Sequence, residues 1–385
     1  MSLDASGTPS WTAPMSDPQS PTVNTAPTRV PLRAFFDLLA RERVFLVALA
    51  IGFFLSGVSS PYAPYAMWVG FAFAGYSAVA NDSIQTIGTF IASNRHRPWW
   101  VLWLFMGGIF LATTAWSYVN YGGDVSFGRL GAKGFETAPT SFSFLQVAAP
   151  LVLLVLTRMR MPVSTTLLLL SGFTTQAEGI TSVITKSLSG YVVALSCAMA
   201  VWLAAGPLMQ RRFVGKAHPA WRVVQWCTSG ALWSVWLQQD AANIAVYLPR
   251  SMSLLEVGAY ALTIFGGLGL LFWQGGERIQ RVVDEKSNVV DVRAAATIDL
   301  VYAVILYWFK EVSNVPMSTT WVFIGLLGGR ELAMSLRGAA EGDRTVKHAM
   351  KLMGRDLLYA TIGFIVALLL AAAVNPVVRE GLFSR

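Results

Sequence analysis

The pentapeptide PVSTT at residues 162–166 returns almost unchanged as PMSTT at residues 316–320, and both copies lie within otherwise apolar sequence. An acidic turn precedes each copy. Residues 80–82 read Ala-Asn-Asp, and residues 239–243 read Gln-Asp-Ala-Ala-Asn. One chain therefore carries the same two-part pattern twice.

The spacing between the two parts is also nearly the same in both copies. Asp82 and Thr165 are 83 positions apart, and Asp240 and Thr319 are 79 positions apart. Such self-similarity indicates an internal duplication. Duplicated halves of membrane transporters build one site where they meet, so we expect these polar stretches to converge.

Composition places the chain in a membrane. Hydrophobic residues make up 54% of it and charged residues 13%, whereas about 25% of an average soluble domain is charged. The apolar runs at 99–119, 191–206, 254–273 and 357–374 approach the length of about 20 residues that a bilayer core requires. We expect an all-α integral membrane protein that has the lipid bilayer as its surroundings.

The same sequence argues against an enzyme, a metal centre or a bound cofactor. Cys197 and Cys227 have no metal-ligand spacing around them. His96, His218 and His348 all fall in basic connecting loops. The net charge of +8 is attributed to Lys and Arg gathered on the cytoplasmic face, not to nucleic-acid binding.

We expect residues 1–43 to form a disordered tail, because residues 1–28 are rich in Ser, Thr and Pro and contain no Lys or Arg. An extra transmembrane helix at 44–60 follows. The first repeat then occupies residues 61–208 and the second residues 209–385.

Each repeat is expected to contain five crossings. They are placed at 62–94, 99–119, 142–157, 162–186 and 187–206 in the first repeat, and at 222–249, 254–273, 294–309, 316–329 and 356–374 in the second. An odd number of crossings makes the second repeat enter the membrane from the other side, which gives an inverted-topology repeat.

Charge supports this topology. With the N-terminus in the cytoplasm, 22 of the 29 Lys and Arg residues fall on the cytoplasmic side, as the positive-inside rule requires. We expect a multi-pass protein of the plasma membrane, specifically a bacterial inner membrane, and a homodimer stays open.

Polar residues interrupt four of the expected crossings. Segments 62–94 and 222–249 contain Asp, and segments 162–186 and 316–329 open with the hydroxyl clusters. Irregular backbone at membrane depth is tolerated only where protein or a wet cavity surrounds it. We therefore expect broken or re-entrant helices at the midplane, and the sequence leaves open whether the hydroxyl segments cross or turn back.

The hydroxyl clusters suit an oxyanion. A helix start leaves backbone N–H groups unpaired and carries partial positive charge, so it can hold an anion without Lys or Arg. The alternative is that the hydroxyls cap helices or bond the preceding turn. The predicted oxyanion ligands are Ser164, Thr165, Thr166, Ser318, Thr319 and Thr320.

The acidic turns suit a small cation. An ionised Asp in apolar surroundings costs at least about 2.5 kcal/mol, and a bound Na⁺ or proton would neutralise it beside an incoming anion. Cation and anion then favour each other's binding, which is the basis of symport. The predicted coupling residues are Asn81, Asp82, Gln85, Gln239, Asp240 and Asn243, with Na⁺ sites at Asp82 and Asp240 as the one metal interaction considered.

Other acidic residues also fall in or beside apolar segments. Asp299 could neighbour a basic loop residue. Glu178 and Glu331 follow the two hydroxyl clusters at similar intervals, although Glu331 could simply pair with Arg330.

These motifs resemble the inorganic phosphate transporter family of Na⁺- or H⁺-coupled symporters, which includes sulfate permeases. The resemblance covers about residues 62–374 and rests on both acidic turns and both Pro-x-Ser-Thr-Thr clusters. It implies that the Asn/Asp turns bind the coupling cation and that the Ser-Thr-Thr clusters bind the oxyanion. The chain departs from the family pattern at Gln85, Gln239, Leu167 and Trp321, so it resembles a divergent member.

The leading prediction is therefore secondary active transport of inorganic phosphate, coupled to Na⁺ or H⁺ and working by alternating access. A sulfate permease of the same fold and an uncoupled anion channel or facilitator are the alternatives. A third class is a membrane-embedded enzyme or a receptor that binds the anion without moving it. The lack of a recognisable nucleophile and base argues against the enzyme.

Overall fold

The computed structural model of the protein describes residues 32–131, 134–159, 161, 163–273, 291–312, 317–337 and 345–383. In those ranges every regular element is a helix and none is a strand, which confirms the all-α prediction. Six of the helices are long and apolar enough to cross a membrane. Residues 1–31 of the predicted tail, Pro162 and Pro316 lie outside the described residues.

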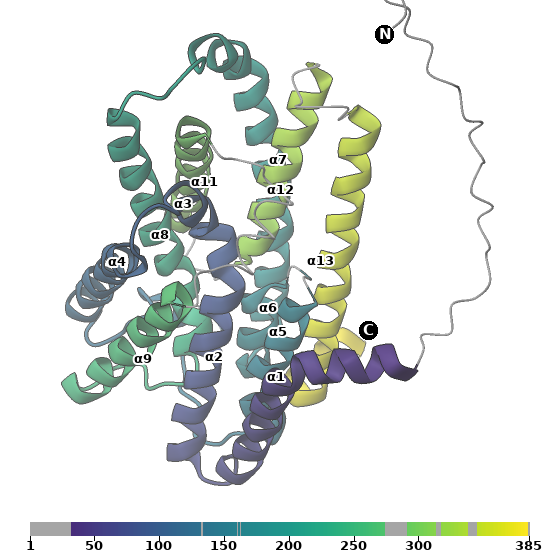
Figure 1. The fold of residues 1–385 in the computed structure, drawn as a ribbon. Helices are drawn as coiled ribbons and strands as arrows, with labels where there is room; N and C mark the ends of the chain where they lie inside the picture. Colours follow the sequence, from purple (N-terminus) through teal and green to yellow (C-terminus); the bar gives the residue numbers. More distant parts are fainter. Residues whose placement is uncertain are drawn as a thin grey trace, which may run out of the picture. The chain divides into compact units, whose positions relative to one another are not determined.

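The helices have the following order along the chain. In order they are α1 (Leu32–Ser59), α2 (Ala63–Thr86), α3 (Gly88–Ser93), α4 (Trp99–Asn120), η1 (Arg129–Gly131), α5 (Phe144–Arg158), α6 (Thr165–Leu169), η2 (Leu170–Phe173), α7 (Ala177–Arg212), α8 (Ala220–Ala245), α9 (Leu254–Trp273), α11 (Val292–Val312), α12 (Thr319–Leu336), α13 (Val346–Val374) and α14 (Pro376–Phe383). Figure 1 shows their arrangement.

The chain separates into a short unit, residues 1–48, and a large unit, residues 49–385. In the short unit the described residues belong to α1, which begins at Leu32. The expected tail reached residue 43, so that boundary was placed too late. The sequence Leu-Arg-Ala-Phe-Phe-Asp-Leu-Leu-Ala contains no Pro or Gly to delay the helix. All that follows concerns the large unit.

Two of the four interrupted segments behave differently from each other. Segment 62–94 is broken directly after the acidic turn, because α2 ends at Thr86 and α3 starts at Gly88. By contrast, α8 runs unbroken through Asp240 to Ala245. The break coincides with β-branched residues next to glycine, Thr-Ile-Gly, whereas α8 continues through the helix-favouring sequence Ala-Ala-Asn-Ile-Ala.

The expected boundary between crossings 162–186 and 187–206 is wrong. Residues 177–212 form one helix, α7, and the hydroxyl cluster opens only the short pair α6 and η2. Ser187 and Ser189 do not end the helix, because each hydroxyl donates to a backbone carbonyl of its own turn, at 2.7 and 2.9 Å.

The segment that carries the first hydroxyl cluster turns back on itself, so that its end lies beside its start. The amide Nε2 of Gln146, in the first turn of α5, donates to the carbonyl of Gly172 in η2 at 3.0 Å. Residues 144–173 therefore form a hairpin whose tip carries the hydroxyl cluster. In Figure 1, α5 and α6 lie in the lower half of the picture and α11 and α12 in the upper half.

Two ends of the large unit can be defined from its connections. The basic end contains loop 94–98 and the turn at 213–215, which accepts hydrogen bonds from Arg293 at the start of α11. The opposite end contains residues 121–143 and 246–253, joined by a bond from the Met252 amide to the Gly123 carbonyl at 3.0 Å. These names are used below.

Small residues set the position of α12. Gly325 and Gly329 face α7, where a Cβ at either position would collide with the carbonyls of Tyr191 and Leu195. Spacing of glycine every four residues lets two membrane helices approach closely. The close contact fixes the N-terminal turn of α12, which carries the second hydroxyl cluster.

Candidate functional site

The two hydroxyl clusters start their helices in the same way. Ser164 precedes α6 with φ −76° and ψ 111°, and Ser318 precedes α12 with φ −78° and ψ 108°. Ser164 caps its helix, because its Oγ accepts from the Leu167 amide at 3.1 Å. Ser318 does not, and its Oγ has no hydrogen-bond partner in the described part of the chain. The capping alternative therefore holds for Ser164 alone.

The last hydroxyl of each cluster bonds the other cluster. Thr166 Oγ1 donates to the Met317 carbonyl at 2.9 Å, and Thr320 Oγ1 donates to the Val163 carbonyl at 3.0 Å. These residues occupy equivalent positions in PVSTT and PMSTT. The two tips thus meet through a reciprocal pair of hydrogen bonds, about 150 residues apart in sequence.

Asp240 lies at the centre of one group of side chains. Its Oδ2 accepts from Thr319 Oγ1 at 2.7 Å, and its Oδ1 lies 3.5 Å from Thr166 Oγ1. Asn243 Nδ2 donates both to Asp240 Oδ1 and to Thr165 Oγ1. The carboxylate of the second acidic turn is therefore bound by hydroxyls of both clusters.

Asp82 is the centre of a second group. Its Oδ1 accepts from Asn81 Nδ2 at 2.7 Å and from Gln85 Nε2 at 3.2 Å. Gln85 Nε2 also donates to Thr320 Oγ1 at 3.2 Å, and Asn81 Nδ2 donates to the Val163 carbonyl of the first cluster at 3.0 Å. The Asp82 and Asp240 carboxyls are close enough to repel each other. The first acidic turn therefore reaches both hydroxyl clusters as well.

Nine of the twelve predicted residues thus join one polar centre, while three have other surroundings. Ser164 caps α6, Ser318 makes no side-chain bond among the described residues, and Gln239 Nε2 donates to the Leu306 carbonyl of α11 at 2.8 Å. All twelve side chains are buried, and Gln85 is the most exposed of them at 8%. The centre is closed to solvent in this conformation.

Several buried oxygens of the predicted coupling residues have no hydrogen-bond donor among the described residues. They are Asp82 Oδ2, Gln85 Oε1, Gln239 Oε1 and Asn243 Oδ1. Each belongs to a predicted coupling residue. A buried acceptor that lacks a donor costs about 1–3 kcal/mol, so a bound cation or water would stabilise this arrangement.

No protein family, curated protein or solved structure matches this chain. Any functional argument therefore rests on the arrangement of these side chains and on what they can bind. Hard oxygen ligands, two carboxylates and a set of hydroxyls can hold a small cation and an oxyanion together.

Sequence reasoning missed three residues that support the centre. Arg129, 1% exposed, donates from Nε to the Gln238 carbonyl at 2.7 Å and attracts Asp240. Tyr302 donates to the Thr319 carbonyl at 3.0 Å, and Ser187 accepts from the Ser318 amide at 2.8 Å. Nothing in the local sequence distinguishes these residues from ordinary loop or helix positions.

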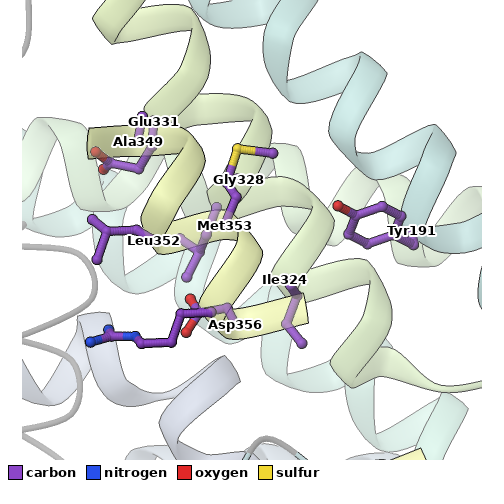
Figure 2. A pocket seen from close by; sticks show the side chains of 10 residues that line it. Tyr191, Ile324, Gly328, Glu331, Ala349, Leu352, Met353 and Asp356 are labelled. Atoms are coloured by element: carbon purple, nitrogen blue, oxygen red, sulfur yellow. The ribbon is translucent and has the colours of Figure 1, made fainter. Parts of the chain in front are cut away.

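Glu331 and Glu178 lie outside the polar centre. Glu331 pairs with Arg330 at 2.7 Å, as the simpler of the two predictions had it, and lines a pocket between α7, α12 and α13 with Tyr191 and Asp356 (Figure 2). That pocket contains none of the twelve predicted residues. Glu178 is exposed in the first turn of α7, so the surroundings of Glu178 and Glu331 are not equivalent.

Proposed function

We propose that the protein is a secondary active transporter that moves an inorganic oxyanion, phosphate or sulfate, by symport with Na⁺ or H⁺. The observation that carries the proposal is the set of buried oxygens without donors on Asp82, Gln85, Gln239 and Asn243. Asp82, Gln85 and Asn243 belong to the centre that contains hydroxyls from both duplicated clusters. The resemblance of the motifs to the inorganic phosphate transporter family agrees with this assignment.

The proposed architecture is an inverted repeat with its two-fold axis in the membrane plane. The reciprocal bonds of Thr166 and Thr320 support it, because a two-fold axis makes equivalent residues exchange equivalent contacts. The equal backbone angles at Ser164 and Ser318 support it as well. In this proposal the basic end faces the cytoplasm of a bacterial cell.

Anion binding would use the hydroxyls of Thr166 and Thr320, each of which donates to the backbone of the other hydroxyl cluster in the present conformation. Thr166 and Thr320 can donate to an anion oxygen only after giving up their carbonyl partners. Entry of the anion therefore requires the two tips to separate, and its departure lets them rejoin. The buried centre corresponds to the closed state of an alternating-access cycle.

Cation binding would offset the cost of keeping Asp82 and Asp240 ionised near each other. Their carboxyls repel, and a second negative charge from an oxyanion would add to that repulsion. A cation between these groups removes it, so that the anion and the cation bind more tightly together than alone. Symport follows from that linkage.

Uptake of radiolabelled phosphate and sulfate into proteoliposomes, with and without inward Na⁺ or proton gradients, tests the proposal. We expect gradient-driven accumulation that Asp82→Asn and Asp240→Asn both abolish. Glu311→Gln, which changes an exposed carboxylate paired with Lys310, is the matched control. Accumulation by both Asn variants with unaltered ion dependence would remove the cation assignment, and downhill flux alone would favour an uncoupled facilitator.

A further inference from the structure

A third buried carboxyl lies outside the centre described above. Asp299 on α11 is 1% exposed. Its Oδ2 accepts from Ser229 Oγ of α8 at 2.5 Å, and its Oδ1 accepts from Thr89 Oγ1 of α3 at 2.8 Å. Among the described residues its partners are thus hydroxyls from two other helices, whereas the basic residues Arg278, Arg281 and Lys286 of the preceding loop lie outside the described residues.

A chain of polar side chains connects Asp299 to the basic end. Gln225 Nε2 donates to Ser229 Oγ at 3.3 Å and to Ser93 Oγ at 2.8 Å. Asn94 Nδ2 donates to Gln225 Oε1 at 3.0 Å, and Asn94 is the first residue of loop 94–98. Side chains that can exchange hydrogen bonds therefore extend without interruption from that loop to the carboxyl.

The same carboxyl lies next to the centre. Thr89 is one helical turn beyond Gln85 along the broken α2–α3 segment. Tyr302 is one turn beyond Asp299 on α11 and donates to the Thr319 carbonyl at 3.0 Å. Asp299 thus stands between the basic end and the residues that we assign to cation and anion binding.

Among the residues that the structure describes, no charged side chain forms an ion pair with Asp299. On α8 the charged residues are Arg222, at the start of the helix, and Asp240, in the centre; α3 carries none. On α11 the guanidinium of Arg293 is engaged by Asp291 and by the carbonyls of residues 213–215, and Lys310 pairs with Glu311. On α12 Arg330 pairs with Glu331. On α7 the charged residues are Glu178 in the first turn, Lys186, and Arg211 and Arg212 in the last turn.

We propose that Asp299 is a proton-binding site, and that water entering between Gln225, Asn94 and Ser93 from the basic end carries the proton to and from it. A proton given up by a hydronium ion forms an O–H bond on the carboxylate, and its release to a water molecule at the basic end forms hydronium again. A proton fits better than Na⁺, because both carboxylate oxygens already accept hydroxyl hydrogens. An ionised carboxylate at membrane depth is costly without a counter-charge, and protonation removes that cost.

The consequence for transport rests on the proposed function. If the centre moves an oxyanion inward, a proton that reaches Asp299 from the centre while the centre is open to the opposite end, and then leaves to water at the basic end, couples the inward proton gradient to that movement. The site would then make H⁺ the coupling ion, in place of the open choice between Na⁺ and H⁺.

Infrared difference spectroscopy of the purified protein in nanodiscs, recorded across pH steps, tests the proton site without any transport. We expect a carbonyl band of a protonated carboxylic acid that is missing in Asp299→Asn. Ser229→Ala and Thr89→Val keep the carboxyl but remove one hydrogen bond, so they should shift the band. An unchanged band in Asp299→Asn, or no pH-dependent band from folded protein, would overturn the site.

Uptake under an inward proton gradient tests the coupling separately. Asp299→Asn should lose the stimulation by the gradient, while Thr297→Val should respond as the parent protein does, because the Thr297 hydroxyl bonds only its own helix. A titrating Asp299 with unaltered gradient response in Asp299→Asn would contradict its role in coupling. If the parent protein moves neither anion, the proposed function fails while the infrared result still decides the proton site.

Discussion

The centre is closed by hydrogen-bonded polar side chains toward the basic end and by packed aromatic rings toward the opposite end. Seven residues after Asp82 stands Thr89, whereas seven residues after Asp240 stands Tyr247. Eleven residues before the same carboxylates stand Phe71 and Ser229, respectively. Thr89 and Ser229 bond Asp299 toward the basic end, while Tyr247 and Phe71 pack among aromatic rings toward the opposite end.

The aromatic side is tightly packed. The Tyr247 ring lies 4.8 Å from Phe173 and 6.3 Å from Phe142, between ring centroids, and its hydroxyl donates to the Gln146 carbonyl at 2.8 Å. Phe71 stacks on Tyr260 at 5.3 Å. Water can replace the hydrogen bonds of a polar barrier, but it cannot replace the contacts of packed rings. The opposite end is therefore closed by packed rings, whereas the basic end is closed by hydrogen-bonded side chains whose bonds water can replace.

The largest expected difference between the two ends is in stability. Tyr247→Ala removes a fully buried ring and should cost about 3–5 kcal/mol, as other aromatic truncations do. Thr89→Ala removes one hydroxyl and should cost about 1 kcal/mol. Thermal unfolding in detergent compares them, and similar losses for both variants would show that the two barriers are not of different kinds.

A second test concerns the tips that both barriers enclose. Thr166→Val and Thr320→Val keep the side-chain shape but leave the Met317 and Val163 carbonyls without their donors, so each should cost about 1–2 kcal/mol. If the two tips are equivalent, the two losses are equal. Thr361→Val is the control, because its exposed hydroxyl bonds its own helix. A loss in one variant only would argue against two-fold related tips.

A third test compares access at one pair of matched positions. Ser229 and Phe71 are both fully buried, and Cys197 and Cys227, the cysteines of the parent, must first be replaced by serine. In that background Ser229→Cys should react with a small polar thiol reagent, while Phe71→Cys should react much more slowly. Rates measured by mass spectrometry decide this, and faster reaction at position 71 would reverse the assignment of the hydrated side.

The smallest expected effect concerns the anchors of the two ends. Arg250 holds the opposite end through four backbone carbonyls, and Arg293 holds the basic end with Asp291 as a partner at 2.6 Å. The hydrogen bond from Arg293 lowers the pKa of Asp291 below its ordinary value. Asp291 thus stabilises the fold above its unfolded pKa of about 4 and loses that effect as pH falls through the lowered folded pKa.

Asp291→Asn should therefore lower the melting temperature slightly at neutral pH. Since Asp291 is partly exposed, the difference should be small, and it should vanish in acid. Melting curves of variant and parent at several pH values measure it. A difference that grows as pH falls would contradict the sign.

The residues of the polar centre were easier to predict from the sequence than the bounds of the helices. The duplicated PVSTT and PMSTT, each with an acidic turn before it, predicted that these polar stretches converge, and hydrogen bonds join Asp240 to Thr319 and Asn243 to Thr165. These residues could be selected from the sequence because charged and hydroxyl residues stand out against apolar sequence. The continuous helix α7 was missed, since Lys-Ser-Leu-Ser resembles a loop until its hydroxyls are seen to bond their own helix.

The partners of Asp299 were also beyond the sequence. Thr89, Ser229 and Asp299 lie on three elements that are up to 210 residues apart, and no local pattern links them. Likewise, the hydroxyls of Thr166 and Thr320 could equally have donated to backbone carbonyls of their own helices. The close approach of the two hydroxyl clusters decides which carbonyls these hydroxyls reach.

Equilibrium binding of radiolabelled phosphate and sulfate to the purified protein, measured with and without Na⁺ and at several pH values, tests the central claim most directly. The account predicts that one cation tightens binding of the anion. It also predicts that saturating anion tightens binding of that cation by the same factor. Loss of both effects in Asp240→Asn would place the linkage at the described centre. Anion binding that ignores both Na⁺ and pH, or no binding of either anion, would contradict the account.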